Sequence, residues 1–146
     1  MTTINPYLSF KDNCEQAFEF YKSVFGGEYN GINRFGDMPM PGMPPLSEDE
    51  AKKIMHISLP IGGDSYLMGS DSFEGMGPGL QVGNNVNISI HPDSKEKAKK
   101  IFDGLSAGGK VTIPIEDAPW GAYFGMLIDK FGTSWMVNFD YEQNKK

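Results

Sequence analysis

The sequence has one cysteine, no long apolar run and no excess of positive charge. Because Cys14 stands alone, the chain can form neither an internal disulfide nor a cysteine-based metal cluster. Every apolar stretch is shorter than the roughly 20 residues that cross a bilayer. The net charge is -6, whereas binding to nucleic-acid phosphates requires a basic surface. These absences argue against a membrane protein and against a nucleic-acid partner.

The motifs of several common enzyme classes are missing as well. The chain has no GxxxxGK(S/T) loop for nucleotide phosphates, no paired CxxC for zinc and no GxSxG nucleophile elbow. Its first ten residues, MTTINPYLSF, lack the basic segment and long apolar core of a secretory signal. A chain of 146 residues has the length of about one domain. We therefore expect a single cytoplasmic domain.

The first half of the chain predicts a strand, a helix and three further strands. Residues 5–10 alternate with a period of two, which is typical of a strand with one face on a core. A helix follows, capped by Asp12 or Asn13 and ended by the glycine pair 26–27. Its expected core face consists of Ala17, Phe20, Tyr21 and Val24. Strands are predicted over 28–35, 54–61 and 65–70, the last two joined by a turn at 62–64.

The second half repeats this order. A strand is predicted over 86–90, and Asp93 with Glu96 forms a capping-box pattern for a second amphipathic helix. The expected core face of this helix consists of Ala98, Ile101, Phe102 and Leu105. Strands are predicted over 110–116, 122–129 and 133–140. The pattern indicates a duplication, with module 1 at about 1–72, a glycine-rich linker at about 73–84 and module 2 at about 85–146.

Two irregular features accompany the modules. Residues 37–45, DMPMPGMPP, contain prolines that cannot join a central strand, so we interpret this methionine-rich segment as a flap over a site, a dimer contact or a loop without a role. After it, Ser47 with Glu50 predicts a capping box for a short helix through Lys53.

Three segments resemble a known family. They are NPYLSFKDNCEQAFEFYKSVFGGE, MHISLPIGGDSYLMGSD and PWGAYFGMLIDKFGTSW, which together span nearly the whole chain. They are similar to the PhnB-like branch of the vicinal oxygen chelate superfamily, which includes glyoxalase I, bleomycin-resistance proteins and extradiol dioxygenases. The resemblance implies an α+β fold of tandem βαβββ modules that curl a mixed sheet around a cleft, often within a homodimer. A methyltransferase label used for the branch lacks support here, because no glycine-rich loop follows the first strand.

The resemblance also implies where a divalent metal would bind in glyoxalase-like members. The corresponding positions fall on Asn5, near Met68, on Asn85 or Asn87, and on Met136. Amide oxygens are weak ligands for such ions, and thioethers suit soft copper. We therefore expect no metal cofactor. A metal held by unusual ligands, such as His56 with Asp71, stays open as the alternative.

The candidate ligand-binding residues follow from the same alignment and from strand alternation. They are Asn5, Tyr7, His56, Met68, Asn85, Asn87, Trp120, Met136 and Asn138. A water-exposed sheet face would alternate in the same way, so solvation is the competing interpretation. The apolar Met136 should line the cleft, while its neighbour Trp135 should lie under the helices.

Three side chains have a chemical and a structural interpretation. His56, on the same strand face as Ser58, is either a general base or a structural hydrogen-bonding group. Cys14 at a helix start is either nucleophilic or a packed apolar residue, and the second is favoured. Trp120 forms a pocket wall, a core anchor or a dimer contact.

Three functions remain as hypotheses. The first is a homodimeric protein that binds a small polar molecule in a sheet cleft without metal. The alternative is a divalent-metal-dependent lyase, isomerase or dioxygenase of the vicinal oxygen chelate type. The third is a purely structural or regulatory homodimer. Saturable binding without turnover, metal-dependent turnover, or neither would distinguish them.

Overall fold

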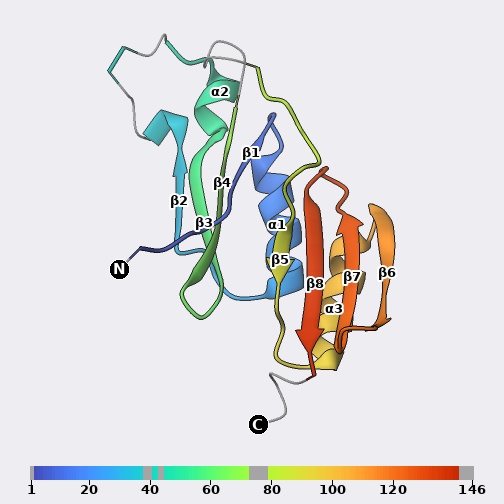
Figure 1. Cartoon of the computed structure of the whole chain (residues 1–146). Coiled ribbons are helices and arrows are strands. Elements are labelled where there is room, and N and C mark those ends of the chain that lie inside the picture. The colour runs from blue at the N-terminus through green and yellow to red at the C-terminus, as the bar shows by residue number, and fades with distance from the viewer. Residues whose placement is uncertain (1, 38–40, 43–44, 73–78, 142–146) are drawn as a thin grey trace. The chain divides into compact units, whose positions relative to one another are not determined.

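The computed structural model describes residues 2–37, 41–42, 45–72 and 79–141 (Figure 1). Parts of the predicted flap (38–40 and 43–44) and of the predicted linker (73–78) lie outside the described residues. The chain divides into two compact units, unit 1 at Met1–Gln81 and unit 2 at Val82–Lys146. This division falls within the stretch predicted as a linker.

Unit 1 contains one four-stranded mixed sheet. Along the chain its elements are β1 (Tyr7–Phe10), α1 (Cys14–Phe25), β2 (Gly31–Arg34), η1 (Phe35–Asp37), α2 (Glu48–Lys52), β3 (Ile54–Gly62) and β4 (Ser65–Asp71). The strand order is β1-β4-β3-β2. β1 runs parallel to β4, and the other pairs are antiparallel.

Unit 2 repeats this topology. Its elements are β5 (Ile88–Ile90), α3 (Lys95–Ser106), β6 (Lys110–Ala118), β7 (Ala122–Ile128) and β8 (Ser134–Asp140). The strand order β5-β8-β7-β6 has the same sequence of steps as in unit 1, and β5 is again parallel to its neighbour. The predicted α+β fold of two βαβββ modules is confirmed.

Strand boundaries differ from the predicted ones by a few residues. β1 begins at Tyr7 and β5 at Ile88, so Asn5, Asn85 and Asn87 precede their strands. β2 covers only Gly31–Arg34 of the predicted 28–35, whereas β6 continues to Ala118. For β1 and β5, period-two alternation extended the prediction into residues before the first ladder pair.

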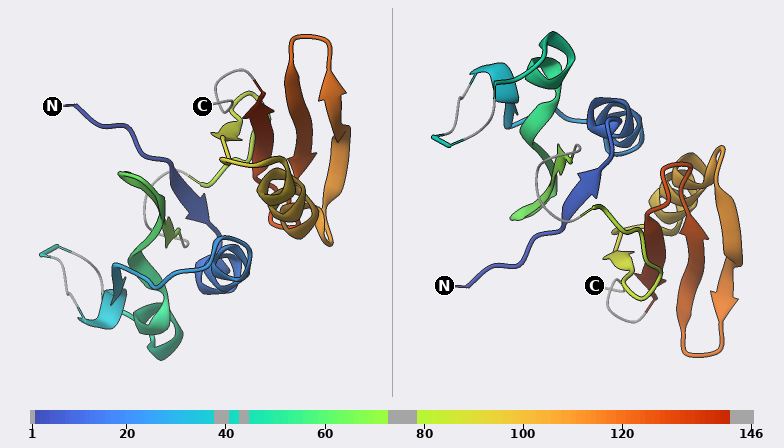
Figure 2. Two further views of the ribbon diagram at one scale, coloured as in Figure 1. Left: turned by 90° about the horizontal axis from the view of Figure 1, so that it is seen from below. Right: turned by 90° about the horizontal axis from the view of Figure 1, so that it is seen from above.

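In unit 1 the core lies between α1 and one face of the sheet, as the end-on views of Figure 2 show. The buried side chains of α1 are Cys14, Ala17, Phe18 and Tyr21. The predicted face was partly wrong, because Phe18 is buried where Phe20 and Val24 are half-buried. A Cβ built on Gly69 would come within 2.7 Å of Phe18 Cε1. Glycine at this position therefore allows α1 to pack closely on β4.

The start of α1 is held by a carboxylate from the end of the neighbouring strand, because Asp71 of β4 is the register partner of Phe10. Asn13 is the N-cap but makes no side-chain cap hydrogen bond. The backbone N–H of Cys14 instead donates to Asp71 Oδ1 at 2.9 Å, and that of Ile54 donates to Asp71 Oδ2 at 2.8 Å. The predicted side-chain cap by Asp12 or Asn13 is therefore wrong. Asp71 ties together the beginnings of α1 and β3 at the end of β4.

The helices α2 and α3 are capped by side chains of their own N-cap residues. α2 has the predicted capping box between Ser47 and Glu50, which is confirmed. The predicted box of α3 is displaced by one residue, because Ser94 is its N-cap and accepts from the Lys97 N–H. Asp93 pairs instead with the Lys97 ammonium on the surface.

In unit 2 the core lies between α3 and one face of its sheet. Trp135 is fully buried, and its Nε1–H donates to Asp129 Oδ2 at 2.8 Å. Asp129 Oδ1 accepts from the N–H groups of Phe131 and Thr133, so the same carboxylate shapes the predicted D-K-F-G turn. The prediction that Trp135 lies under the helix is confirmed.

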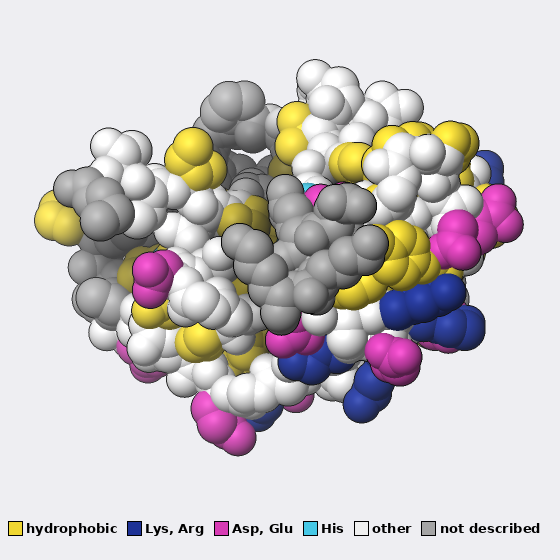
Figure 3. Space-filling model, turned by 60° about the horizontal axis from the view of Figure 1, so that its bottom comes forward, with side chains coloured by type: hydrophobic (Ala, Val, Ile, Leu, Met, Phe, Trp, Pro, Cys, Tyr) yellow, Lys and Arg dark blue, Asp and Glu magenta, His cyan; other side chains and the backbone are white. Residues whose placement is uncertain are grey.

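Charges of opposite sign are mixed on the surface. The view in Figure 3 shows acidic and basic side chains next to one another. On α3, Lys99 pairs with Asp103 four residues on. None of the described helices is long and apolar enough to cross a membrane.

Candidate functional site

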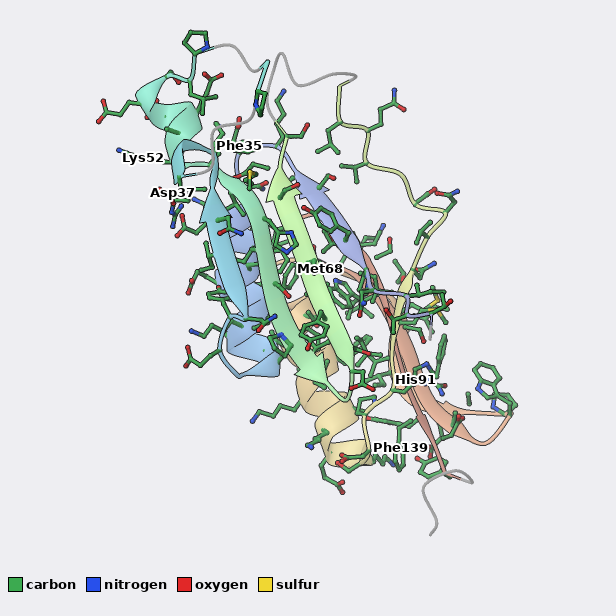
Figure 4. The ribbon with its side chains drawn as sticks, turned by 90° about the vertical axis from the view of Figure 1, so that its left-hand side faces the viewer. Phe35, Asp37, Lys52, Met68, His91 and Phe139 are labelled. Atoms are coloured by element: carbon green, nitrogen blue, oxygen red, sulfur yellow. The ribbon has the colours of Figure 1, made fainter. Side chains whose placement is uncertain are left out.

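Each sheet has one face against its helix and one face turned away from it, which we call the open face. In unit 1, Gly69 faces α1, so its neighbours Met68 and Ser70 point to the other side. Figure 4 labels Met68 on β4, with α1 beyond the sheet. The strand side chains of the unit 1 open face include Tyr7, Ser9, Asn33, His56, Ser58, Pro60, Tyr66, Met68 and Ser70.

The register arranges these side chains in rows across the strands. Tyr7 pairs with Met68, and Met68 pairs with Ser58. In the next row Ser9 pairs with Ser70, and the antiparallel ladder that joins Ile57 to Gly69 places Ser70 beside His56. His56 pairs in turn with Asn33 on β2. Hydroxyl, amide and imidazole groups from all four strands therefore meet on this face.

Tyr7 and His56 contact each other between the two rows. Tyr7 Oη lies 3.4 Å from His56 Nδ1, and the ring centroids are 5.7 Å apart at an interplanar angle of 32°. Tyr7 is 47% exposed, while Ser58 beside them is only 6% exposed. This pair is the centre of the unit 1 open face.

Asn5 has a local role that the sequence did not indicate. Its Oδ1 accepts a hydrogen bond from the Tyr66 N–H at 3.0 Å. Tyr7, and not Asn5, is the register partner of Met68. The side-chain oxygen expected at a metal position is thus engaged in joining the segment before β1 to β4.

The proposed alternative pair of His56 and Asp71 is separated by the sheet. Asp71 follows Ser70 on β4 and therefore points to the helix side, where both of its oxygens accept backbone hydrogen bonds. Cys14, on the same side, is fully buried. Burial first, then the charges of Asp71 and Glu15, raise the pKa of the Cys14 thiol well above its ordinary value. The structure supports the packed interpretation of this cysteine.

The open face of unit 2 has methionine and phenylalanine side chains at its centre, with the carboxylates of Glu116 and Asp140 in neighbouring register pairs. Ser89 pairs with Met136, which pairs with Met126. Asn138 pairs with Phe124 in the next row, and Ile113 of β6 pairs with Met126. Met136 and Trp135 point to opposite sides of β8, as predicted. Ser89 is the register partner of Met136. The exposed Asn85 and Asn87 precede Ser89 in the chain and therefore lie outside that row.

The predicted residue Trp120 and the histidine that follows β5 lie near this face. Trp120 is in the β6–β7 turn, is 64% exposed and packs edge-on against Phe124 with ring centroids 5.3 Å apart. It is therefore not a core anchor of unit 2. His91, which follows β5, has its Nε2 2.9 Å from Ser89 Oγ.

Sequence reasoning missed several open-face residues. Ser70, Met126 and Phe124 were not singled out, although each lies two residues from a predicted neighbour or opposite one. Alternation gives the face of a residue within its own strand. It does not give the pairing between strands, which decides which side chains become neighbours.

The comparisons with known proteins agree with this architecture. A model of the family described as 3-demethylubiquinone-9 3-methyltransferase matches residues 2–138. The chain belongs to this family. Protein YjdN of Escherichia coli strain K12 is 30% identical over 151 residues, which cover 96% of this chain and 97% of that protein.

Solved structures extend the likeness to three dimensions. Protein PA1353 from Pseudomonas aeruginosa is 38% identical with a TM-score of 0.81, over 96% of this chain and 98% of that one. The PhnB protein from Bacillus cereus has a TM-score of 0.72 at 24% identity, over 94% of this chain and 99% of that one. The predicted resemblance of this chain to the PhnB-like branch is confirmed.

More distant structures show the superfamily fold. The fosfomycin resistance protein FosX from Listeria monocytogenes, complexed with Mn(II) and sulfate, has a TM-score of 0.63 at 12% identity, over 99% of this chain and 96% of that one. A glyoxalase-related enzyme from Fulvimarina pelagi has a TM-score of 0.63 at 17% identity, over 96% of this chain and 88% of that one. The chain therefore has the glyoxalase/bleomycin-resistance-like fold.

The residues at the positions where the resemblance implies a metal do not offer the donors that a hard divalent ion such as Mn(II) prefers. Such ions take carboxylate, carbonyl and water oxygens, or imidazole nitrogens. The register pairs here combine Tyr7 with Met68 and Ser89 with Met136, which supply a phenol, a hydroxyl and two thioethers. Among the residues that the structure describes, no three His, Cys, Asp or Glu side chains form a group that would hold a metal ion.

Proposed function

We propose that this protein binds a small polar organic molecule on the open faces of its sheets and does so without a divalent metal ion. The fold supports the binding of a small molecule, since FosX, with the same fold, was solved with sulfate and Mn(II). The chemistry of the open-face side chains supports the metal-free form of binding.

The observation that carries the proposal is the uncharged polar character of the unit 1 open face. Charged residues make up 22% of the chain, and a sheet face that is merely solvated commonly includes lysine, arginine or carboxylates. The strand side chains of this face include none of them. A few convergent hydroxyl, amide and imidazole groups beside apolar surface are the usual lining of a small-molecule site.

Methyl transfer is not part of the proposal. The segment between β1 and α1 is Lys11, Asp12 and Asn13, which provides no glycine-rich loop for a nucleotide-like methyl donor. The geometry around Tyr7 and His56 would suit hydrogen bonding to a ligand with or without a subsequent proton transfer.

A fragment screen observed by two-dimensional NMR of the full chain tests the proposal. In the presence of EDTA, we expect saturable shifts of backbone amides in β3, β4 or β8 for a subset of polar fragments. Ser70→Ala should weaken hits on the unit 1 open face several-fold, because its half-buried hydroxyl lies in the His56 row. Ser23→Ala is the matched control, because its hydroxyl lies on α1 and bonds to the Phe20 carbonyl.

Two results would overturn the proposal in different ways. The absence of saturable shifts on both open faces would remove the binding function. Binding that disappears with EDTA and returns with one equivalent of Mn(II), retained after desalting, would replace it with a metal-dependent function.

A further inference from the structure

The side chains of the unit 1 open face bear on which ligand charge this face can accept. The inference rests on the proposed function. We infer that this face selects uncharged ligands, bearing hydroxyl, carbonyl or amide groups, over carboxylates, phosphonates and sulfates. The Tyr7–His56 pair and the hydroxyl of Ser70 would form the hydrogen bonds.

Two basic side chains near this sheet, Arg34 and Lys53, are occupied elsewhere. Arg34 follows Asn33 across a β-bulge, and its guanidinium makes two hydrogen bonds to Glu15 of α1 and one to the Lys52 carbonyl. Lys53, which precedes β3, is paired with Asp12. Neither cation is directed to the open face.

An anionic group would therefore lose hydration on this face without gaining an opposite charge. Transfer of an ionised group out of water is costly unless it is paired. The net charge of -6 adds long-range repulsion of anions. Neutral hydroxyls and carbonyls avoid both effects, because the serine, tyrosine, asparagine and imidazole groups offer donors and acceptors of matching strength.

The thioether of Met68 and the ring of Tyr7 favour a flat apolar portion of the ligand beside these polar groups. Met68 lies between Tyr7 and Ser58 in one row. A thioether and a phenol ring provide an apolar surface on which a ring can lie, since methionine makes favourable contacts with aromatic edges and faces. The face thus combines uncharged hydrogen-bonding groups with the small apolar surface of Met68 and the Tyr7 ring.

Matched pairs of probes distinguish the charge preference from binding in general. Each pair joins an uncharged amide to its carboxylate, such as benzamide with benzoate and nicotinamide with nicotinate. Affinities would be measured by NMR titration of the full chain at pH 8, above the range in which histidines usually titrate. We expect the amides to bind the unit 1 open face at least tenfold more tightly than the carboxylates.

A charge-introducing variant makes the test independent of absolute affinity. Ser70→Arg places a guanidinium in the His56 row and should reverse the preference in favour of the carboxylates. Ser65→Arg is the matched control, because Ser65 is exposed at the start of the same strand and outside the rows; it should leave the preference unchanged.

The outcomes separate the two levels of the argument. Carboxylates that bind this face of the wild-type protein as tightly as their amides would overturn the inference and leave the proposed function intact. A preference that Ser70→Arg fails to reverse, in a variant whose spectrum shows a folded protein, would also overturn it. Failure of both members of every pair to bind either open face would overturn the proposed function itself.

Discussion

Replacement of Asp71 by asparagine tests whether a single carboxylate holds the beginnings of α1 and β3. Asp71 is 3% exposed, and its two oxygens accept from Cys14 N and Ile54 N at 2.9 and 2.8 Å. A hydrogen bond to a charged group contributes about 1.5–3 kcal/mol. The amide of asparagine keeps one acceptor and turns an N–H2 group toward the second donor. One bond is lost and one buried N–H is left unpaired.

We therefore expect Asp71→Asn to lower the free energy of unfolding by about 3 kcal/mol, which corresponds to a Tm lower by about 10 °C for a chain of this size. Urea unfolding followed by circular dichroism would measure the loss. Hydrogen exchange should accelerate at the amides of Cys14 and Ile54. Asp64→Asn, in the exposed β3–β4 turn, is the control and should change stability by less than about 0.5 kcal/mol. A loss below about 1 kcal/mol with unchanged protection of both amides would refute the reasoning.

Three further predictions concern unit 1. Gly69→Ala should lower the free energy of unfolding in urea by about 1–3 kcal/mol, because its Cβ would overlap an α1 ring. Gly31→Ala is the control: it has open space around it and should lower that free energy by less than about 0.5 kcal/mol. Equal losses in the two variants would contradict the packing argument. Cys14 should react with a thiol reagent far more slowly in the native protein than in urea, because burial raises the pKa of its thiol; fast native labelling would contradict this. The hydrogen bond from Arg34 lowers the pKa of Glu15, so this largely exposed pair should stabilise the protein by at most about 1 kcal/mol at pH 7. The difference from Glu15→Gln should be fully present above the ordinary pKa of a glutamate and should shrink as the pH falls through the lowered pKa of Glu15. A difference that does not shrink in acid would exclude the ion pair as its cause.

The repeated pattern of strand, helix and three strands was readable in the sequence because it depends on local periodicity. The capping box at Ser47 and the alternation of Trp135 with Met136 were predicted correctly for the same reason: each relates residues that are neighbours along the chain. The turn after Asp129 also depends on residues within four positions of it.

The tertiary structure decided which residues meet across strands and across layers. Asp71 caps α1 from 57 residues away, so no local motif announces it. The parallel register of β1 places Tyr7, two residues beyond Asn5, beside Met68. Side-chain alternation fixes the face of each residue, but a shift of two residues preserves the face and changes every neighbour. The sequence by itself therefore determined the modules and the faces of their strands. The constellation around Tyr7 and His56 arose only when hydrogen bonding between distant strands set the register.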